Sequence, residues 1–467
     1  MSTRIMPLLV ALATIAAAAL LSACGTSAKS SPTRTPTKTD PRSTTTSRSA
    51  AASLPLEYSE CMRAHRVRKF PDPVDGHVTL SPASGINPDS PTFQAAAEAC
   101  AKYGPSGDSG EGSSTAGATT ATAASPETWR DFAAWLKAQA AGGRFSGSVL
   151  VAKRDQTVLD AGYGLADRAT RAPNVPATLF CVASIGKLFT AVAIGQLAER
   201  HKLSFDAPVG DYLTGLPAAI GNHVTIGDLL DMTAGLGNAV LGRASPPRTL
   251  DQMVSLIANE RLQFQPGARF FYSNDDYVLL GAVVQKLSGE SYVDYLRTHI
   301  LAPAGMTHTG YSTYIPGRVS GMAHGYALTG STLHDISDEP QIANPSGGAY
   351  STTGDLLRFA RAVLDHKLLT PAMTATILTP RVESPQPGGP PVDKYTYGFA
   401  YQKVNGITFV GHNGGTPGYA GQIDIYPHTG CVVVILTNQD NALVPAIQRS
   451  EAILTSSPQA CGADGRR

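Results

Sequence analysis

The stretch Phe180–Val192, FCVASIGKLFTAV, holds a serine and a lysine three residues apart, Ser184 and Lys187, among apolar neighbours. No proline interrupts residues 184–200, and apolar side chains recur there at helical spacing, so we predict a helix. Residues i and i+3 share a helix face, which places the Lys187 amine beside the Ser184 hydroxyl. A partly buried, neutral amine can take the proton of that serine. A lone Ser-x-x-Lys pattern is usually a solvated pair, so this interpretation depends on further motifs.

A second motif, Tyr272-Ser273-Asn274, follows two phenylalanines. The Asn274 side chain offers both a donor and an acceptor to an amide substrate. The Tyr272 phenol can shuttle protons if nearby cations lower its pKa. The structural alternative is a tyrosine packed at a loop-to-helix junction, with Asn274 or Asp275 as the helix cap.

A third motif, Gly411-His412-Asn413-Gly414-Gly415, follows a strand that we predict at residues 407–410. Glycines at a strand end let the backbone approach a ligand closely. The N–H of Gly415 could pair with the N–H of Ser184 to form an oxyanion hole. The structural alternative is a glycine-rich turn in a hairpin.

The pattern of residues 126–456 predicts one large α+β domain. Ser125-Pro126-Glu127 is typical of the N-cap and first turn of a helix. An antiparallel sheet covered by the first and last helices, with a helical insert between them, accommodates the order of the predicted elements. These are a hairpin at 148–152 and 157–159, strands at 397–401, 407–410, 422–426 and 431–437, and a closing helix at 443–454.

In this order and spacing, the three motifs resemble the serine beta-lactamase-like family. That family includes class C beta-lactamases, D-alanyl-D-alanine carboxypeptidases, D-aminopeptidases and related esterases. Residues 224–236 are similar to the family's helix before the second motif, and residues 347–356 to a later signature turn and helix. The resemblance covers roughly residues 125–454 and implies a beta-lactamase/transpeptidase-like fold.

The resemblance implies catalytic roles for three motif residues. Ser184 would be the nucleophile, Lys187 would activate it, and Tyr272 would pass the proton to the leaving group. Whether Lys187 or Tyr272 is the general base stays open, because their titrations would be coupled.

The resemblance also implies a substrate-binding set of Asn274, His412, Gly414 and Gly415. Asn274 would bind the acyl-side amide, and the Ser184 and Gly415 N–H groups would stabilise the oxyanion. His412 departs from the family's beta-lactamases, which usually carry a lysine there that contacts the substrate carboxylate. A histidine with its ordinary pKa of ~6.5 is largely neutral at pH 7, so His412 favours esters or peptides over beta-lactams.

The composition excludes other classes of function. The 467 residues include 37 basic and 36 acidic side chains, a net charge of +1 that offers no excess positive charge to nucleic acid. The histidines show no zinc spacing such as His-Glu-x-x-His, and the sequence holds no Walker loop. We therefore expect no metal and no cofactor. The expected partner is a small ester or peptide substrate, with a cell-wall peptide among the candidates.

Residues 1–23 predict a secretory signal, with Arg4 before the apolar run Ile5–Leu21. Leu21-Ser22-Ala23-Cys24 resembles a bacterial lipobox, which implies a lipid on Cys24 and cleavage before it. The alternative is an uncleaved membrane anchor. Because two acyl chains hold a protein stably on a bilayer, we expect an exported bacterial lipoprotein at the outer face of the cell membrane.

Two linkers flank a small module. Residues 24–53 are rich in Ser, Thr and Pro and predict a disordered tether, and residues 104–125 predict a flexible linker. Residues 54–103 are expected to form two helices that a Cys61–Cys100 disulfide joins, since so short a chain has a marginal core. The module resembles a short domain of secreted actinobacterial lipoproteins, which brings no known chemistry. A solvated face or an acidic-polymer site would explain its basic cluster of Arg63, His65, Arg66, Arg68 and Lys69.

The remaining cysteines allow one geometric inference. The strand at 431–437 and the helix at 443–454 run in opposite directions over ~20 Å and ~18 Å, which returns Cys461 to Cys431. We predict that disulfide, with residues 457–467 as a C-terminal tail. Cys181 is expected to be a buried thiol beside the helix of the nucleophile.

Together, these features predict an exported, membrane-anchored serine hydrolase that acts through an acyl-enzyme on Ser184. Its substrate is expected to be an ester or a D-amino-acid peptide, as in a D-alanyl-D-alanine carboxypeptidase or an esterase. One alternative is a catalytically silent cell-wall ligand-binding protein on the same fold. Another is an adhesin in which the basic N-terminal module binds wall polymer. The presence of all three motifs favours the enzyme.

Overall fold

The computed structural model describes residues 56–68, 70, 96, 99–100, 127–241, 247–311, 319–339, 342–384, 393–456 and 461. The chain divides into Met1–Ala52 and Ser53–Arg467. The predicted signal peptide, Cys24, the tether, the second linker and most of the tail lie outside the described residues. Among the helices in the described ranges, none has the length and hydropathy needed to cross a bilayer.

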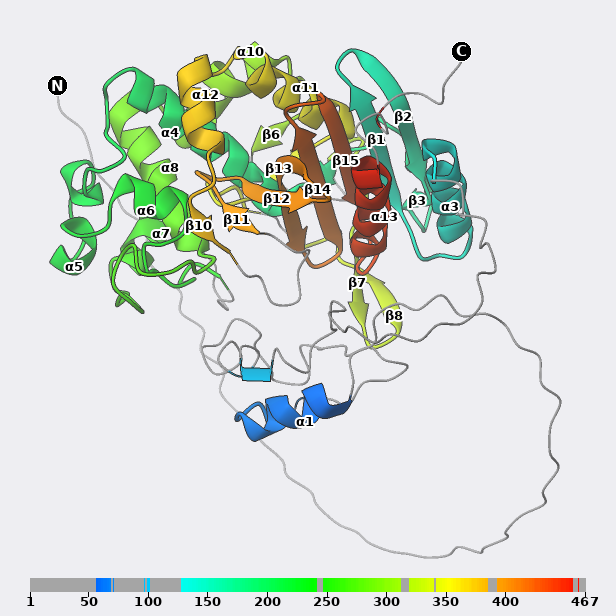
Figure 1. The fold of residues 1–467 in the computed structure, drawn as a ribbon, viewed down its shortest axis with the longest axis horizontal. Helices are drawn as coiled ribbons and strands as arrows, with labels where there is room; N and C mark the ends of the chain where they lie inside the picture. Colours follow the sequence, from blue (N-terminus) through cyan, green and yellow to red (C-terminus); the bar gives the residue numbers. More distant parts are fainter. Residues whose placement is uncertain are drawn as a thin grey trace, which may run out of the picture. The chain divides into compact units, whose positions relative to one another are not determined.

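An antiparallel sheet of eight strands organises the larger domain (Figure 1). Its order is β10-β11-β12-β13-β14-β15-β1-β2, so the last strand in sequence lies beside the first. The strands are β1 (Gly147–Lys153), β2 (Gln156–Tyr163), β10 (Val382–Glu383), β11 (Lys394–Tyr395), β12 (Ala400–Val404), β13 (Ile407–Thr416), β14 (Tyr419–Tyr426) and β15 (Cys431–Thr437).

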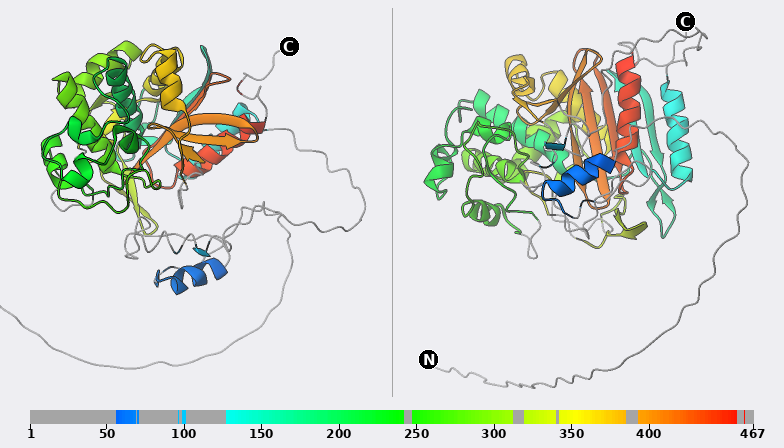
Figure 2. Two further views of the ribbon diagram at one scale, coloured as in Figure 1. Left: turned by 60° about the vertical axis from the view of Figure 1, so that its left-hand side comes forward. Right: turned by 60° about the horizontal axis from the view of Figure 1, so that its bottom comes forward.

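Two helices from opposite ends of this domain, α3 (Trp129–Ala141) and α13 (Leu443–Ser456), lie side by side against one face of the sheet (Figure 2). Their apolar side chains join Phe409, Tyr426 and Ile435 of the sheet in one core cluster. Both helices were expected, but the prediction of Ser125 as the N-cap of α3 is wrong. Thr128 is the cap, because its hydroxyl and the Asp131 carboxylate satisfy each other's backbone N–H groups in a capping box.

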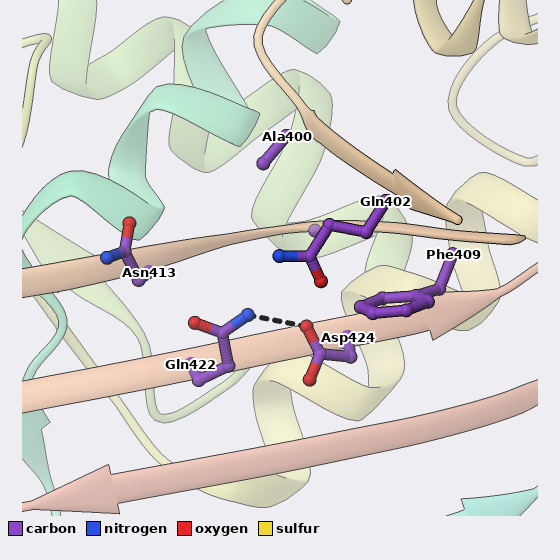
Figure 3. Close-up of a pocket in the computed structure, with 7 residues that line it drawn as sticks. Ala400, Gln402, Phe409, Asn413, Gln422 and Asp424 are labelled. Atoms are coloured by element: carbon purple, nitrogen blue, oxygen red, sulfur yellow. Dashed lines mark hydrogen bonds between the residues drawn. The ribbon is translucent and has the colours of Figure 1, made fainter. Parts of the chain in front are cut away.

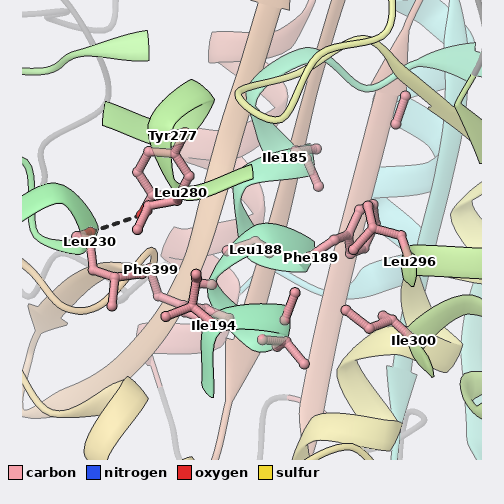
Figure 4. Close-up of a cluster of buried hydrophobic side chains, with 14 of the residues drawn as sticks. Ile185, Leu188, Phe189, Ile194, Leu230, Tyr277, Leu280, Leu296, Ile300 and Phe399 are labelled. Atoms are coloured by element: carbon pink, nitrogen blue, oxygen red, sulfur yellow. Dashed lines mark hydrogen bonds between the residues drawn. The ribbon is translucent and has the colours of Figure 1, made fainter. Parts of the chain in front are cut away.

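The opposite face of the sheet carries the helical region, whose central helices are α4 (Gly186–Glu199) and α8 (Asn274–Ser288). Residues 186–197 of α4 are all buried, including the polar side chains of Lys187, Thr190 and Gln196. Figure 4 shows Phe189 and Ile194 of α4 in one cluster with Tyr277 of α8 and with Phe399.

Shorter elements complete the helical region and its connections. The helices are α5 (Ala218–Gly221), α6 (Ile226–Leu230), α7 (Leu250–Ile257), α9 (Tyr292–Leu296), α10 (Ala302–Ala304), α11 (Thr353–Leu364) and α12 (Pro371–Leu378). The strands outside the main sheet are β3 (Leu165–Asp167), β4 (Ala172–Pro173), β5 (Phe180–Cys181), β6 (Gly310–Tyr311), β7 (Tyr326–Thr329), β8 (Thr332–Asp335) and β9 (Ala349–Ser351).

Two of the strands that differ in length from the sequence-based prediction lie next to the candidate site. The strand expected at 397–401 begins only at Ala400, because Gly398, at φ +94°, makes a turn before it. The third motif lies inside β13, which runs to Thr416 and pairs with β14 along residues 410–416. The alternative of a glycine-rich hairpin turn is therefore wrong, and β12 pairs only with residues 407–411 of β13.

The described part of the small N-terminal module contains α1 (Leu56–Ala64). Met62, Val67 and Phe70 cluster with Cys100, and the predicted Cys61–Cys100 disulfide is present. Arg63 donates a 2.8 Å hydrogen bond to the Phe70 carbonyl, so one member of the basic cluster has a structural contact inside the module. Lys69 and the helix start expected at residues 90–91 lie outside the described residues.

The second predicted disulfide, Cys431–Cys461, is also present, and Cys181 is a buried thiol as expected. This bond ties the chain that follows α13 back to the first residue of β15. It therefore holds α13 against the sheet by a covalent link as well as by packing.

We expect the double substitution Cys431→Ser/Cys461→Ser to lower the free energy of unfolding by about 3 kcal/mol. The two cysteines are 30 residues apart, and closing a loop of that length removes conformational entropy from the unfolded chain. Urea unfolding of the variant and of the wild type, each with and without dithiothreitol, measures the difference. Reduced wild type should match the reduced variant, because dithiothreitol opens Cys61–Cys100 in both proteins. A wild type that is equally stable in both conditions would contradict the prediction.

Candidate active site

Ser184 lies in a 3-10 turn, Ala183–Ile185, between β5 and the start of α4. Ala183 adopts a left-handed conformation with φ +43°, which costs roughly 1–2 kcal/mol for a residue with a Cβ. Flanking hydrogen bonds hold this conformation: Val182 donates to the Ala349 carbonyl and Ile185 to the Val182 carbonyl. Such strain is typical of positions where the backbone must aim a functional side chain.

Lys187 is fully buried, and its amine contacts groups from three separate segments. Its Nζ lies 3.2 Å from Ser184 Oγ, 2.7 Å from Asn274 Oδ1 and 2.7 Å from the carbonyl oxygen of Ser346. The structure therefore brings the first and second motifs together, as the sequence predicted. The Ser346 carbonyl is an additional contact that no motif pattern identified.

Burial lowers the pKa of the Lys187 ammonium well below its ordinary value, and the nearby Asp276 carboxylate acts in the opposite direction. A neutral amine has two N–H donors and one lone pair. The two 2.7 Å contacts take the donors, since Asn274 Oδ1 and the Ser346 carbonyl can only accept. The lone pair then faces the Ser184 hydroxyl, which is the orientation that a general base needs.

Ser273, the middle residue of the second motif, is the N-cap of α8, and its hydroxyl accepts a hydrogen bond from the Asp276 N–H. Neither Asn274 nor Asp275 caps the helix, so Asn274 is available for other contacts. Its backbone N–H and its Nδ2 both donate to Asn238 Oδ1, at 2.7 and 2.9 Å. Asn238 therefore fixes the amide that orients Lys187. No sequence signal distinguished Asn238 from other loop residues.

The Tyr272 ring lies 4.8 Å from the Lys187 Nζ. The condition that nearby cations lower the phenol pKa is not met: burial raises this pKa above its ordinary value, and a hydrogen bond with Ser184 opposes the rise only partly. The phenol is therefore protonated at neutral pH. A protonated phenol can donate a proton, whereas the neutral amine of Lys187 can accept one.

The third motif brings β13 against the turn that carries Ser184. A Cβ placed on Gly414 would lie 2.2 Å from the Val182 carbonyl oxygen and 3.0 Å from the Ser184 nitrogen, whereas one on Gly415 would meet no atom within 4 Å. Only glycine at position 414 allows this approach. The approach is what an oxyanion hole formed by the Ser184 and Gly415 N–H groups requires.

His412 is only 2% exposed, and both of its ring nitrogens have protein partners. Nδ1 contacts the Asn413 carbonyl, which can only accept, so Nδ1 carries the proton and Nε2 accepts from the Tyr395 hydroxyl at 2.9 Å. Burial, with a contribution from Lys187, lowers the His412 pKa to about 3. The sequence placed His412 among the substrate contacts, whereas the structure shows a neutral ring held by its neighbours.

One group of metal-ligating side chains stands out among the described residues. Cys61, His65 and Cys100 bring their ligand atoms within 4.8 Å of one another. Both sulfur atoms belong to the disulfide, so the group as it stands has no thiolate to offer a metal.

We expect Gly414→Ala to abolish most of the activity and to lower the melting temperature, because the new methyl group clashes with the Val182 carbonyl and pushes β13 away from Ser184. Thermal unfolding of the matched variant Gly415→Ala supplies the control. Its methyl group meets open space, so its melting temperature should stay at the wild-type value. Equal destabilisation of the two variants would show that the close contact of Gly414 with the turn of Ser184 is not what requires glycine at this position.

We expect the ratio kcat/KM to rise as the pH passes upward through the Lys187 pKa, because only the neutral amine accepts the Ser184 proton. Asp276 favours the ammonium form of Lys187 where it is ionised, but burial raises the pKa of Asp276 itself well above its ordinary value. In the pH range where Asp276 is ionised, Asp276→Asn should lower the Lys187 pKa further and shift the rising limb of the pH profile to lower pH. Asp365→Asn removes an exposed carboxylate and should leave the limb in place. If the rising limb of the pH profile moves to higher pH in Asp276→Asn, the limb does not report the titration of Lys187.

Comparison with known proteins identifies the family of the large domain. The Beta-lactamase family model matches residues 132–455. A penicillin-binding protein of Bacillus subtilis is 31% identical over 320 residues, which cover 64% of this chain and 69% of that protein.

Two solved structures are also similar. The penicillin-binding protein of Bacillus halodurans is 32% identical, with a TM-score of 0.61 over 68% of this chain and 98% of that one. A D-stereospecific amidohydrolase from Streptomyces is 25% identical, with a TM-score of 0.60 over 71% and 100% of the two chains. The sequence motifs, the fold and the contacts of Ser184 and Lys187 thus lead to one assignment: the chain belongs to the Beta-lactamase family.

Proposed function

We propose that this protein is a serine hydrolase that forms an acyl-enzyme on Ser184 with an ester or a D-amino-acid amide or peptide. The observation that carries the proposal is the contact of the buried Lys187 amine with the Ser184 hydroxyl, the Asn274 amide and the Ser346 carbonyl. A solvated Ser-x-x-Lys pair would need none of these partners. The same contacts favour an enzyme over a silent ligand-binding protein.

In the proposed acylation step, neutral Lys187 accepts the Ser184 proton while Ser184 Oγ attacks the substrate carbonyl carbon. The N–H groups of Ser184 and Gly415 stabilise the oxyanion that forms. When the bond to the leaving group breaks, the protonated Tyr272 phenol donates a proton to it and recovers one from the Lys187 ammonium, beside its ring. Water then attacks the ester of Ser184, and the same groups act in reverse to release the acid.

The second amide hydrogen of Asn274 is the group that we propose meets the acyl-side amide of the substrate. Asn274 Oδ1 accepts from Lys187 and its Nδ2 donates one hydrogen to Asn238, which fixes the plane of the side chain. A substrate carbonyl in that plane can accept the remaining hydrogen. This contact orients amide substrates before the chemical step.

The neutral state of His412 bears on the substrate class. A substrate carboxylate gains most from a fixed positive charge, and a buried imidazole with a pKa of about 3 supplies none at neutral pH. We therefore favour substrates that lack a free carboxylate at this position, namely esters and amides, over beta-lactams and over carboxypeptidase substrates. The likeness to the D-stereospecific amidohydrolase supports the amide alternative. We also keep the proposal that Cys24 anchors the exported chain to the membrane.

Labelling with a fluorophosphonate and with a fluorescent penicillin tests the proposed function. We expect a fluorophosphonate adduct in the wild type, none in Ser184→Ala, and weaker labelling by the penicillin. Turnover of D-amino-acid amides, p-nitrophenyl esters, D-Ala-D-Ala peptides and nitrocefin then ranks the substrate classes, with amides or esters expected first. Ser184→Ala should lower turnover at least about 10⁴-fold.

Circular dichroism of Ser184→Ala confirms that the variant is folded. A folded wild type that forms no Ser184-dependent adduct with either probe would favour the ligand-binding alternative. Nitrocefin or D-Ala-D-Ala peptides as the fastest substrates would overturn the argument from His412.

A further inference from the structure

The loop at residues 237–240 lies behind the second motif and determines where Asn274 points. Asn238, in this loop, accepts hydrogen bonds from the backbone N–H and from Nδ2 of Asn274. Asn274 in turn accepts a hydrogen bond from the Lys187 amine through its Oδ1. The orientation of the general base therefore depends on groups that hold this loop in place.

Two acidic side chains from different segments bind the backbone of the loop. Asp275 Oδ2 accepts from the Ala239 N–H at 2.5 Å, and its Oδ1 accepts from the Val240 N–H at 3.3 Å. Glu260 Oε2 accepts from the Gly237 N–H at 3.1 Å. Asp275 lies fully buried in the first turn of α8, whereas Glu260 follows α7 and is partly buried.

The side chains of Asp275 and Glu260 also hydrogen-bond with each other. Because a carboxylate can only accept, this contact requires one proton that the two carboxyl groups share. Burial and the charge of Glu260 raise the Asp275 pKa to about 7. Asp276, the next residue of α8, also interacts electrostatically with Asp275. Among the described residues, no lysine, arginine or histidine forms an ion pair with either member of the pair.

We propose that Asp275 and Glu260 are positioning residues that share one proton, and that loss of this proton displaces Asn238 and lowers the activity of the site in alkaline solution. The inference rests on the proposed hydrolase function, whose site it regulates. Asn238 lies between the N–H that Glu260 binds and the two that Asp275 binds, so repulsion between two ionised carboxylates acts directly on it. The Gly237 carbonyl still accepts from the Ser273 hydroxyl, so the loop shifts without unfolding.

The expected pH profile has a rising limb and a declining limb. The rate rises as Lys187 loses its proton and falls as the carboxyl pair loses the shared proton. Two other site groups do not titrate near neutrality, because burial raises the phenol pKa of Tyr272 and lowers the His412 pKa to about 3. The declining limb therefore reports either the pair or the neighbouring Asp276, and variants distinguish the two.

The rate of fluorophosphonate labelling of Ser184, measured between about pH 5 and about pH 9, tests the proposal. We expect the wild-type rate to fall at least about 10-fold from its maximum to about pH 9. Asp275→Asn and Glu260→Gln each supply an amide N–H to the remaining carboxylate and thus imitate the protonated pair, so both should lose this decline.

Two further variants separate the pair from its surroundings. Asp275→Ala has neither the acceptor for the loop nor the donor for Glu260, so near pH 7 its labelling should be at least about 10-fold slower than that of Asp275→Asn. Asp276→Asn should keep the alkaline decline. A decline lost only in Asp276→Asn would assign the limb to Asp276 and overturn the proposal.

Thermal unfolding tests the shared proton without any measurement of activity. Because the pKa of Asp275 is raised in the folded protein, the folded state keeps a proton that the unfolded chain releases, and stability falls as the pH rises from about 4 to about 7. Asp275→Asn has no such proton. The wild-type melting temperature should therefore fall by about 3 °C relative to that of Asp275→Asn between about pH 5 and about pH 8.

The two measurements distinguish failure of this inference from failure of the proposed function. Wild-type labelling that is equally fast at about pH 7 and about pH 9 would overturn the inference, and so would a decline that Asp275→Asn and Glu260→Gln both retain in full. A wild type that the probe labels at no pH would contradict the proposed function. A melting-temperature difference that stays constant with pH would overturn the shared proton in either case.

Discussion

The buried amine of Lys187 is the constraint on which the rest of the site depends. A buried amine that is neutral at rest and charged after it accepts a proton needs fixed dipoles in place of water, and here Asn274 and the Ser346 carbonyl supply them. Each partner comes from a different element, so α4, α8 and the segment before β9 must all be in place before the amine has its environment. The burial of residues 186–197 of α4 excludes water from Lys187, which lies in the first turn of that helix.

The central sheet has two distinct faces at β13. Toward α4, the strand presents His412 and Gly414, which fill the space beside Tyr395 and the turn of Ser184. Toward α3 and α13, it presents Phe409, Gly411 and Asn413, which line a small pocket between β12, β13 and β14 (Figure 3). Successive side chains of a strand point to opposite faces, so a displacement of β13 that is caused on one face also moves the residues that point to the other face. The position of β13 is therefore set jointly by the catalytic side and by the helix-covered side.

The sequence predicted six of the eight strands of the main sheet and the helices α3, α4 and α13, because their signals are local. The strand at 431–437, the helix at 443–454 and both disulfides follow from hydrophobic runs, chain lengths and cysteine spacing. The N-cap of α3 and the start of β12 were wrong by about three residues, since several polar or glycine-containing positions compete at an element boundary. The third motif was expected after a strand and lies within one, because pairing with β14 overrides the turn preference of glycine.

By itself, the sequence determined which chemical groups this protein carries: a serine and a lysine one helical turn apart, a tyrosine with an asparagine, and a histidine before paired glycines. Only the tertiary structure decided their ionisation and their contacts. Burial raises the phenol pKa of Tyr272, and His412 is held neutral with both ring nitrogens in contact with protein groups. Asn238, Ser346 and Tyr395 also contact site residues, although no sequence motif identified them. The reason is physical: a pKa and a hydrogen bond depend on burial and on neighbours that are distant in sequence, which local spacing does not encode.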